Sequence, residues 1–159
     1  MARKKKDETP RGVRIRNRKA RHDYRILEVV ECGVALKGTE VKSLRAGQAK
    51  IEGSYARVDN GEVFLVGATI ALYPQASAAM QHDPARDRKL LLHNRQVAML
   101  EAHTRQKGKT VVPLEIYFKR GWAKCELGIA EGRRSHDKRE VLRKRDQQRD
   151  MAREMNRRR

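Results

Sequence analysis

The stretch that decides the fold of this chain is Gly38-Thr39-Glu40-Val41-Lys42-Ser43-Leu44-Arg45. It follows the apolar run Val34–Leu36, which predicts a strand, and its own spacing predicts a short helix. Val41 and Leu44 lie three residues apart and share one helix face, whereas Lys42 and Arg45 share another. The helix should therefore plug a hydrophobic core with one face and present two cations on the other.

The first residues of this stretch fit a helix N-terminus. Gly38 permits a change of chain direction, and Thr39 can cap the first free amides of the helix. The carboxylate of Glu40 is favoured beside the positive end of the helix dipole. An ordinary amphipathic helix with a solvated outer face has the same pattern, so the spacing alone leaves both interpretations open.

The distribution of charge indicates a polyanionic partner. The 159 residues include 38 Lys and Arg against 20 Asp and Glu, which gives a formal net charge of +18. Residues 1–25 carry +8, residues 26–130 carry +4 and residues 131–159 carry +6. A nearly balanced body thus has two strongly basic ends, and an excess of this size is typical of nucleic-acid-binding proteins.

The same composition predicts three regions and their surroundings. We expect a disordered basic N-terminus over 1–12, a globular body over 13–130 and a basic tail over 131–159. Without an apolar signal or membrane segment, the protein is expected to be cytoplasmic. Cys32 and Cys125 lie in apolar runs, so buried free thiols are expected, whether or not the two are neighbours. The chain lacks the spacing of a four-ligand metal site, and no metal is expected.

The first half of the body should consist of strands. A short basic helix over 17–24 leads into an apolar run that predicts a hairpin from Tyr24–Val30 to Val34–Leu36. A meander should follow, because Asp59-Asn60-Gly61 is a strong tight-turn signal between two apolar runs. Another strand is expected around residues 70–73.

The second half predicts a loop, a helix and a hairpin. Residues 75–89 have neither helical nor strand periodicity and are expected to form a loop, and residues 94–107 have helical spacing. The strands Thr110–Lys119 and Trp122–Ile129 should then pair, with a bulge or an edge position at Pro113.

These elements indicate a mainly β fold. The leading prediction is a closed barrel of the oligonucleotide-binding type, with about six antiparallel strands and about three helices, plus the basic C-terminal tail. A split α+β sandwich is the alternative. Aromatic residues are few, so positive charge and shape should matter more than successive stacked bases in RNA recognition.

The tail from Gly132 onward has no continuous apolar stripe. Asp137 and Glu140 resemble a capping box, and Glu140 and Lys144 form an i,i+4 pair. We expect the tail to become helical only when bound, where its cations displace counterions from RNA. A tail that only keeps the protein soluble is the alternative.

Catalysis has little support in the sequence. The five histidines are scattered, and neither a glycine-rich phosphate loop nor a nucleophile elbow is present. We therefore predict a binding protein rather than an enzyme.

Five blocks of the chain resemble the signature motifs of the small protein B (SmpB) family, the bacterial partners of transfer-messenger RNA in trans-translation. The blocks are Asn17-Arg-Lys-Ala-Arg-His-Asp-Tyr24, Gly38-Thr-Glu-Val-Lys-Ser-Leu-Arg45, Asp83-Pro-Ala-Arg-Asp-Arg-Lys-Leu-Leu-Leu-His93, Val111-Val-Pro-Leu-Glu-Ile-Tyr117 and His136-Asp-Lys-Arg139. They follow the order of the family and cover nearly the whole chain beyond residue 16.

The resemblance implies a function in ribosome rescue. The barrel would hold the tRNA-like domain of transfer-messenger RNA (SsrA RNA). The tail would enter the empty mRNA channel of a stalled ribosome at the small-subunit decoding centre. The resemblance implies no cofactor, no membrane contact, no small-molecule substrate and no catalysis.

The resemblance also assigns residues by motif position. The RNA-binding residues would be Asn17, Arg18, Lys19, Arg21, His22, Glu40, Lys42, Arg45, Arg86, Arg88 and Lys89. Those of the ribosome-binding tail would be Gly132, His136, Asp137, Lys138 and Arg139.

Two positions depart from the family pattern. Glu131 stands where many members have Lys, and Gln147 stands where many have Trp, which removes the means of stacking at that point of the tail. Two other classes stay open: a structural ribosomal RNA-binding protein, and a nonspecific nucleic-acid-binding protein. Both would share the basic ends and the small β body.

Overall fold

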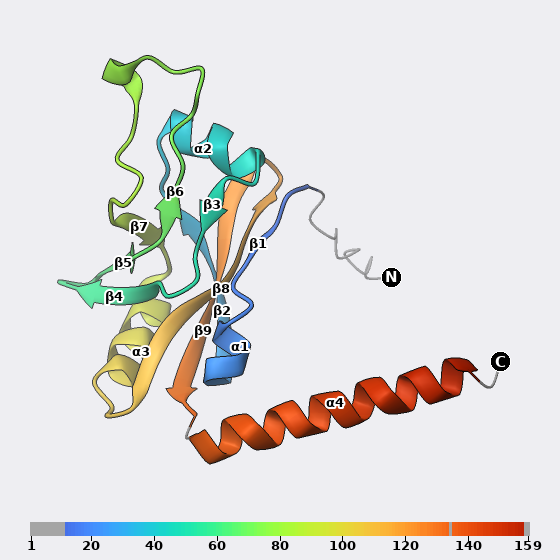
Figure 1. The fold of residues 1–159 in the computed structure, drawn as a ribbon. Helices are drawn as coiled ribbons and strands as arrows, with labels where there is room; N and C mark the ends of the chain where they lie inside the picture. The colour runs from blue at the N-terminus through green and yellow to red at the C-terminus, as the bar shows by residue number, and fades with distance from the viewer. Residues whose placement is uncertain (1–11, 134, 158–159) are drawn as a thin grey trace, which may run out of the picture.

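A computed structural model describes residues 12–133 and 135–157 of the chain (Figure 1). In this part the fold is mainly β, with nine strands and four α-helices. Seven strands form one antiparallel sheet in the order β1-β8-β9-β2-β7-β5-β4, and β3 pairs with β6 separately. Except for Gly12, the predicted disordered N-terminus lies outside the described residues.

The elements follow one another along the chain with these bounds: β1 (Ile15–Arg16), α1 (Ala20–Asp23), β2 (Tyr24–Val34), α2 (Gly38–Arg45), β3 (Ala49–Lys50), β4 (Tyr55–Asp59), β5 (Glu62–Val66), β6 (Thr69–Ile70), the 3₁₀ helix η1 (Ala78–Met80), β7 (Arg88–Leu91), α3 (Asn94–Thr104), β8 (Lys109–Lys119), β9 (Trp122–Gly132) and α4 (Ser135–Arg157).

Three eleven-residue strands, β2, β8 and β9, form the centre of the sheet. Their inward-facing residues, such as Leu127 and Ile129, are fully buried and build the main hydrophobic core. Leu44 from α2 and Leu100 from α3 fill the same core at 1% and 0% exposure. The predicted role of α2 as a core plug is therefore confirmed.

The prediction of a hairpin at Cys32–Gly33 is wrong, because β2 runs without interruption from Tyr24 to Val34. Gly33 pairs with Lys124 on one side and with Leu91 on the other. A Cβ on Gly33 would lie 3.3 Å from the Cβ of Leu91. The glycine therefore permits two strands to approach closely and does not mark a turn.

The prediction of a loop over 75–89 is confirmed for most of the segment, but it misses a short 3₁₀ helix in the first half and a strand at the end. Residues Ala78–Met80 form η1, and Arg88–Leu91 form β7, which pairs with both β2 and β5. The charged side chains at the start of β7 hide its strand character in the sequence. One of them, Arg88, is fully buried, which a local pattern does not indicate.

Other local predictions are confirmed. The β4–β5 turn has Asn60 and Gly61 at positive φ (49° and 76°), as the Asp-Asn-Gly signal requires. The β8–β9 register shifts between Pro113 and Glu115, which is the predicted bulge. The start of α2 differs in detail, because its N-cap residue is Lys37 and not Thr39.

The antiparallel, mainly β class is confirmed, with more strands and helices than expected. The hydrogen-bonded order of the large sheet ends at β1 and β4, so the ladder is not closed among the described residues. The sheet nevertheless curves far enough for β4 to contact β8, which lies second from the opposite end.

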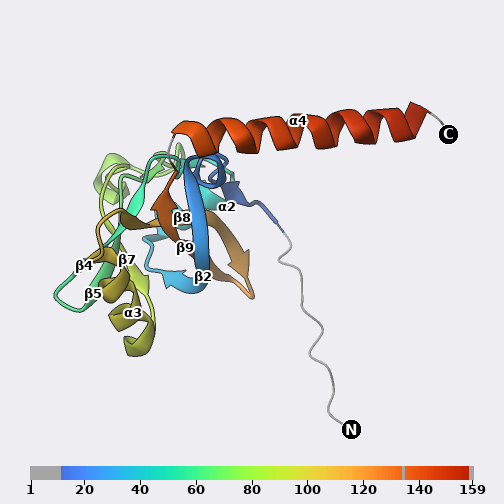
Figure 2. The same cartoon turned by 90° about the horizontal axis from the view of Figure 1, so that it is seen from below.

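The C-terminal helix α4 begins beside α1 and extends away from the sheet in both views (Figure 1, Figure 2). Strand β9 continues to Gly132, which pairs with Tyr24, so the sheet ends two residues beyond the expected boundary at residue 130. No helix in the described ranges is long and apolar enough to cross a membrane.

The cysteines are buried free thiols, as predicted. Cys32 on β2 lies directly opposite Cys125 on β9, and its thiol donates to the Cys125 carbonyl over 3.3 Å. The hydrogen bond with Cys32, together with burial, raises the pKa of the Cys125 thiol well above its ordinary value.

Candidate nucleic-acid interface

A buried carboxylate links α2 to the loop before β7. Glu40 is fully buried, and its Oε1 accepts hydrogen bonds from Arg86 Nε (2.8 Å) and Arg88 Nε (3.0 Å). Its Oε2 accepts from Arg86 Nη2 (2.6 Å) and from the backbone N–H of Lys37 (2.7 Å). The last bond caps the start of α2, so one side chain fixes both the helix and the loop.

Arg88 is fully buried beside Glu40, and both of its Nη groups donate to backbone carbonyls. Nη1 donates to Ala68 (2.8 Å) and Arg86 (3.0 Å), and Nη2 donates to Pro84 (2.9 Å). A guanidinium satisfied in this way stabilises the loop, and its burial leaves no path to a phosphate. The structure therefore favours a positioning role for Arg88 and Glu40 over direct RNA contact.

Burial raises the pKa of the Glu40 carboxyl, but its hydrogen bonds and cationic neighbours have the opposite effect. The hydrogen bonds from Arg86 and the Lys37 backbone, with the charges of Arg88 and Arg86, bring this pKa below its ordinary value. Burial is also the main cause that lowers the pKa of Arg88. The ion pair is therefore present as two charges at neutral pH.

The two cations of α2 point outward, as predicted, and each lies over an aromatic ring. Lys42 Nζ is 5.0 Å from the ring centroid of Tyr73, and the Arg45 guanidinium is 5.4 Å from that of Phe118. Both cations are exposed. The ring contacts restrict the long side chains without neutralising them, which suits them to phosphate groups.

A buried histidine outside the predicted site residues, His82, anchors the 71–87 loop. His82 is 3% exposed, with Nδ1 2.8 Å from Thr39 Oγ1 and Nε2 3.0 Å from the carbonyl oxygen of Ile70. Because a carbonyl only accepts, Nε2 is the donor of the second bond. Thr39 of α2 thus serves as the partner of His82. Only the fold, which brings the 71–87 loop next to α2, reveals this contact.

The first motif block divides into a buried residue and exposed cations. Asn17 is 7% exposed; its Nδ2 donates to the carbonyl of Pro113 (3.0 Å), and its Oδ1 accepts from the N–H of Ala20 at the start of α1 (3.0 Å). Arg18, Lys19 and Arg21 are exposed around it.

His22 is half-buried and pairs with the adjacent Asp23, with 2.9 Å between Nδ1 and Oδ1. In this first motif block, the hydrogen bonds of Asn17 hold α1 on the sheet, and Arg18, Lys19 and Arg21 present positive charge to the solvent.

A groove between the N-terminal segment, α1 and α4 gathers arginines from both ends of the chain. We call this groove the arginine groove; its arginines are Arg14, Arg16, Arg18, Arg21, Arg145 and Arg149. Glu115 on β8 holds two of them, with contacts of 2.9 Å to Arg14 and 3.3 Å to Arg16. Four of these arginines, Arg14, Arg16, Arg145 and Arg149, lie outside the motif residues, and only the fold brings them together with Arg18 and Arg21.

The structure keeps the arginine groove apart from the cations of α2. Helix α1 packs through Ala20 against Val112 and Leu114 of β8, whereas Arg45 of α2 lies over Phe118. At about 3.3 Å per residue, these points are roughly 13–20 Å apart along β8. The exposed cations of the arginine groove and those of α2 thus form two separate surfaces.

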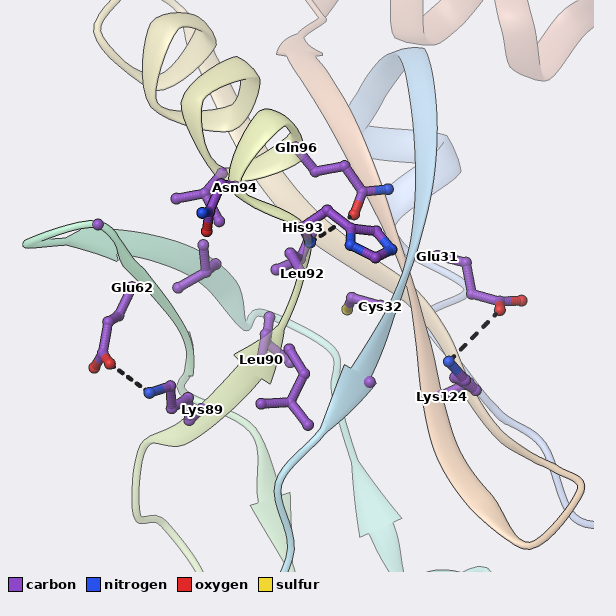
Figure 3. Close-up of a pocket in the computed structure, with 15 residues that line it drawn as sticks. Glu31, Cys32, Glu62, Lys89, Leu90, Leu92, His93, Asn94, Gln96 and Lys124 are labelled. Carbon is purple, nitrogen blue, oxygen red and sulfur yellow. Dashed lines mark hydrogen bonds and ion pairs between the residues drawn. The ribbon is translucent and has the colours of Figure 1, made fainter.

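Lys89 lies apart from both surfaces, in a cleft of about 560 Å³ between β2, β7 and the start of α3 (Figure 3). It pairs with Glu62 on one wall, and Lys124 lies 3.9 Å from Glu31 on the other. The hydrogen bond from the Tyr117 hydroxyl is the main cause that lowers the pKa of Glu31. Because each acid has a lysine partner, the cleft has little net charge.

The tail residues are only partly described. Gly132 ends β9, while His136, Asp137, Lys138 and Arg139 lie in the first two turns of α4, and their side chains fall outside the described part. No group of three or more His, Cys, Asp or Glu that could hold a metal ion occurs among the described residues.

Comparisons with known proteins identify the family of this chain. The model of the family described as SmpB protein matches residues 14–157. An SsrA-binding protein of Halalkalibacterium halodurans is 51% identical over 146 residues, covering 92% of this chain and 94% of the relative. One from Salinispora arenicola is 51% identical over 151 residues, covering 95% and 94%.

A solved structure is also similar. A chain in the work named "tmRNA-SmpB: a journey to the center of the bacterial ribosome" superposes with a TM-score of 0.65 at 51% identity, covering 82% of this chain and 94% of that one.

Proposed function

The chain belongs to the SmpB protein family, and from this premise we propose that it binds transfer-messenger RNA and acts with it on the ribosome in trans-translation. The observation that carries the proposal is the extent of the family match. It runs from Arg14 into α4 and so includes both cation-rich surfaces. The protein acts by binding, in the cytoplasm where ribosomes work, and performs no chemistry of its own.

Within this function, exposed and buried residues have different roles. We assign direct contacts with RNA phosphates to the exposed cations Arg18, Lys19, Arg21, Lys42 and Arg45. His22, half-buried beside them, can donate to the same RNA. The buried members of the motifs, Asn17, Glu40 and Arg88, hold these cations in position.

Two residues lie between these classes. Arg86 is bound to Glu40 with its side chain 26% exposed, so it orders the loop and contributes one charge at the surface. Lys89, paired with Glu62 at 45% exposure, can exchange its carboxylate partner for a phosphate.

We also propose the finer fold and the role of the tail. The contact of β4 with β8 supports a barrel of the oligonucleotide-binding type. The tail from Gly132 enters the empty mRNA channel, where His136, Asp137, Lys138 and Arg139 place its helix. Without RNA or ribosome, a helix with so little apolar surface should fray, and on binding its charge should offset the cost of ordering.

The decisive experiment identifies the RNA that the protein prefers. Purified protein is titrated with three RNAs of similar length at several salt concentrations: the tRNA-like domain of transfer-messenger RNA, an elongator tRNA and a ribosomal RNA fragment. The expected result is tighter binding of the tRNA-like domain at every salt concentration. Equal binding of all three would indicate a nonspecific binder, and stoichiometric retention on ribosomal subunits without transfer-messenger RNA would indicate a structural ribosomal protein.

A further inference from the structure

A large aromatic side chain stands in solvent at the tip of the β8–β9 hairpin. The side chain of Trp122 is 71% exposed, and it is the only tryptophan of the chain. Tryptophan is usually well buried, because its ring gains much free energy on leaving water. An exposed indole is therefore a marked departure, and the roles assigned above to cations do not account for it.

The backbone that carries Trp122 forms a tight two-residue hairpin turn. Trp122 lies directly opposite Lys119 in the ladder, and the two turn residues between them, Arg120 and Gly121, have φ angles of 51° and 81°. This is the left-handed pair that a tight two-residue hairpin turn needs. The adjacent Phe118 packs against the main core and under the guanidinium of Arg45. The tip is thus held in place while the indole stays outside.

The surroundings of the indole are cationic. Because side chains alternate along a strand, Lys119, Trp122 and Lys124 share one face of the hairpin, and Phe118 occupies the other. The segment Tyr117–Lys124 contains three cations and no acid. Glu31 of β2 lies 3.3 Å from Lys119 and 3.9 Å from Lys124, so the two lysines share one carboxylate and a net positive charge remains on this face.

This setting favours RNA over protein as the partner. A tryptophan that anchors a protein interface is usually ringed by apolar side chains, and charged residues are depleted there. A base that stacks on an aromatic ring carries phosphates on both sides, and nearby cations match them. The α2 cation Arg45 lies over Phe118 on the opposite face of the same hairpin, so one cation of the α2 surface is also close to this hairpin.

We propose that Trp122 stacks on an unpaired base of the transfer-messenger RNA, while Lys119 and Lys124 neutralise the phosphates next to it. This inference rests on the proposed function and adds a contact that charge alone does not supply. Any base has a face that can stack, so the contact selects an unpaired nucleotide at the right place in the folded RNA and not a particular sequence. It would add a shape requirement to an attraction that is otherwise electrostatic.

The single tryptophan makes the test direct. The intrinsic fluorescence of the wild-type protein is recorded while the tRNA-like domain of transfer-messenger RNA is added, and binding is followed in parallel by filter retention. We expect strong quenching that saturates with binding, and protection of the indole from acrylamide. Trp122→Ala should bind this RNA about tenfold more weakly, and Trp122→Phe should be impaired less. Met80→Ala is the matched control, because Met80 is 76% exposed on an uncharged loop tip.

The outcomes separate the two proposals. If the wild-type protein binds the RNA with no change in fluorescence or acrylamide access, the stacking contact is wrong and the proposed function stands. The same holds if Trp122→Ala binds like Met80→Ala, or if quenching appears only after ribosomes are added. If the wild-type protein does not prefer the tRNA-like domain at all, the proposed function fails and the inference fails with it. Since the indole is exposed, equal thermal unfolding of the variants will show that the fold is retained.

Discussion

The carboxylate of Glu40 and the guanidinium of Arg88 form an ion pair at 3.0 Å in which both side chains are fully buried. The two residues are 48 positions apart and join the start of α2 to the start of β7. Buried charges of this kind are tolerated only when every donor and acceptor is satisfied. The pair therefore serves the placement of the α2 cations, and disturbing it should first affect stability.

Replacing Glu40 with glutamine should strongly destabilise the protein. The variant leaves Arg88 charged, buried and without its counter-ion, a change that typically costs about 3–5 kcal/mol. Glu40→Lys should be worse, because it adds a third cation beside Arg86 and Arg88. Urea unfolding measures the loss. Glu62→Gln is the control, since Glu62 pairs with Lys89 at the surface and should change stability by less than about 1 kcal/mol. Equal effects of Glu40→Gln and Glu62→Gln would contradict the buried pair.

Stability should fall in acid, partly through the same carboxylate. The pKa values of Glu40 and Glu31 in the folded protein lie below the ordinary value of 4.5. A lowered folded-state pKa contributes stability above the unfolded-state pKa, and this contribution is lost as the pH falls through the folded-state value. The free energy of unfolding should therefore be nearly constant above about pH 5.5 and decrease below about pH 4.5.

The acid dependence can be assigned with a variant. The difference in unfolding free energy between wild type and Glu40→Gln should shrink as the pH falls, because protonation removes the wild-type carboxylate as well. A pH series of urea unfolding curves measures this. A difference that stays constant from neutral pH down to pH values below the ordinary carboxyl pKa would mean that Glu40 does not titrate with unfolding.

Asn17 and Arg18 should separate stability from RNA binding. Asn17→Ala removes the side-chain bonds that hold α1 and the Pro113 carbonyl, and should cost about 1–3 kcal/mol. Arg18→Ala removes an exposed cation and should change stability by no more than about 0.5 kcal/mol, while weakening RNA binding. Thermal unfolding and filter retention on the same samples give both quantities. If Arg18→Ala bound RNA like wild type, the arginine groove would lose its assigned role.

The double variant Lys42→Ala/Arg45→Ala should weaken RNA binding without unfolding the protein. For each phosphate that is no longer neutralised, the log–log salt dependence of the binding constant should flatten by roughly 0.7–0.9. The matched control is Arg105→Ala/Lys107→Ala, which removes the same charge from the exposed end of α3. Binding that falls equally in both variants would show that net charge, and not the α2 surface, attracts the RNA.

Truncation in the tail should separate RNA binding from activity on the ribosome. Because β9 and its pairing extend to Gly132, the chain is cut after Arg133, which keeps the sheet complete. The truncated protein should bind the tRNA-like domain with only a modest loss from reduced charge, yet fail to support peptidyl transfer to alanyl-charged transfer-messenger RNA on ribosomes without a codon in the A site.

The triple variant Asp137→Ala/Lys138→Ala/Arg139→Ala tests whether geometry in the tail matters. It lowers the net charge by only one, so a large loss of transfer must come from the placement of the helix. RNA binding by the same variant serves as the control. Full transfer by the triple variant would mean that the tail is only a solubilising extension.

Much of the local structure was predictable from the sequence. Helix α2 follows from the spacing of Val41 and Leu44, and the tight turns follow from Asn60–Gly61 and Arg120–Gly121. These signals lie within a few residues of one another, so they need no knowledge of the fold. The wrong predictions arise because local signals do not show contacts with distant segments. Gly33 resembles a turn residue, but a glycine is present there because the distant strand β7 comes too close to leave room for a side chain.

The sequence by itself determined most of the elements, the basic ends and the family resemblance, because each is encoded in neighbouring residues or in composition. Only the tertiary structure decided which charges are buried and which face solvent. Glu40 meets Arg86 and Arg88 because β7 pairs with β2 next to α2, and Trp122 is exposed because it lies at the hairpin tip, beyond Lys124, where the pairing of β9 with β2 ends. Burial depends on contacts between residues far apart in the chain, and a local pattern does not contain them.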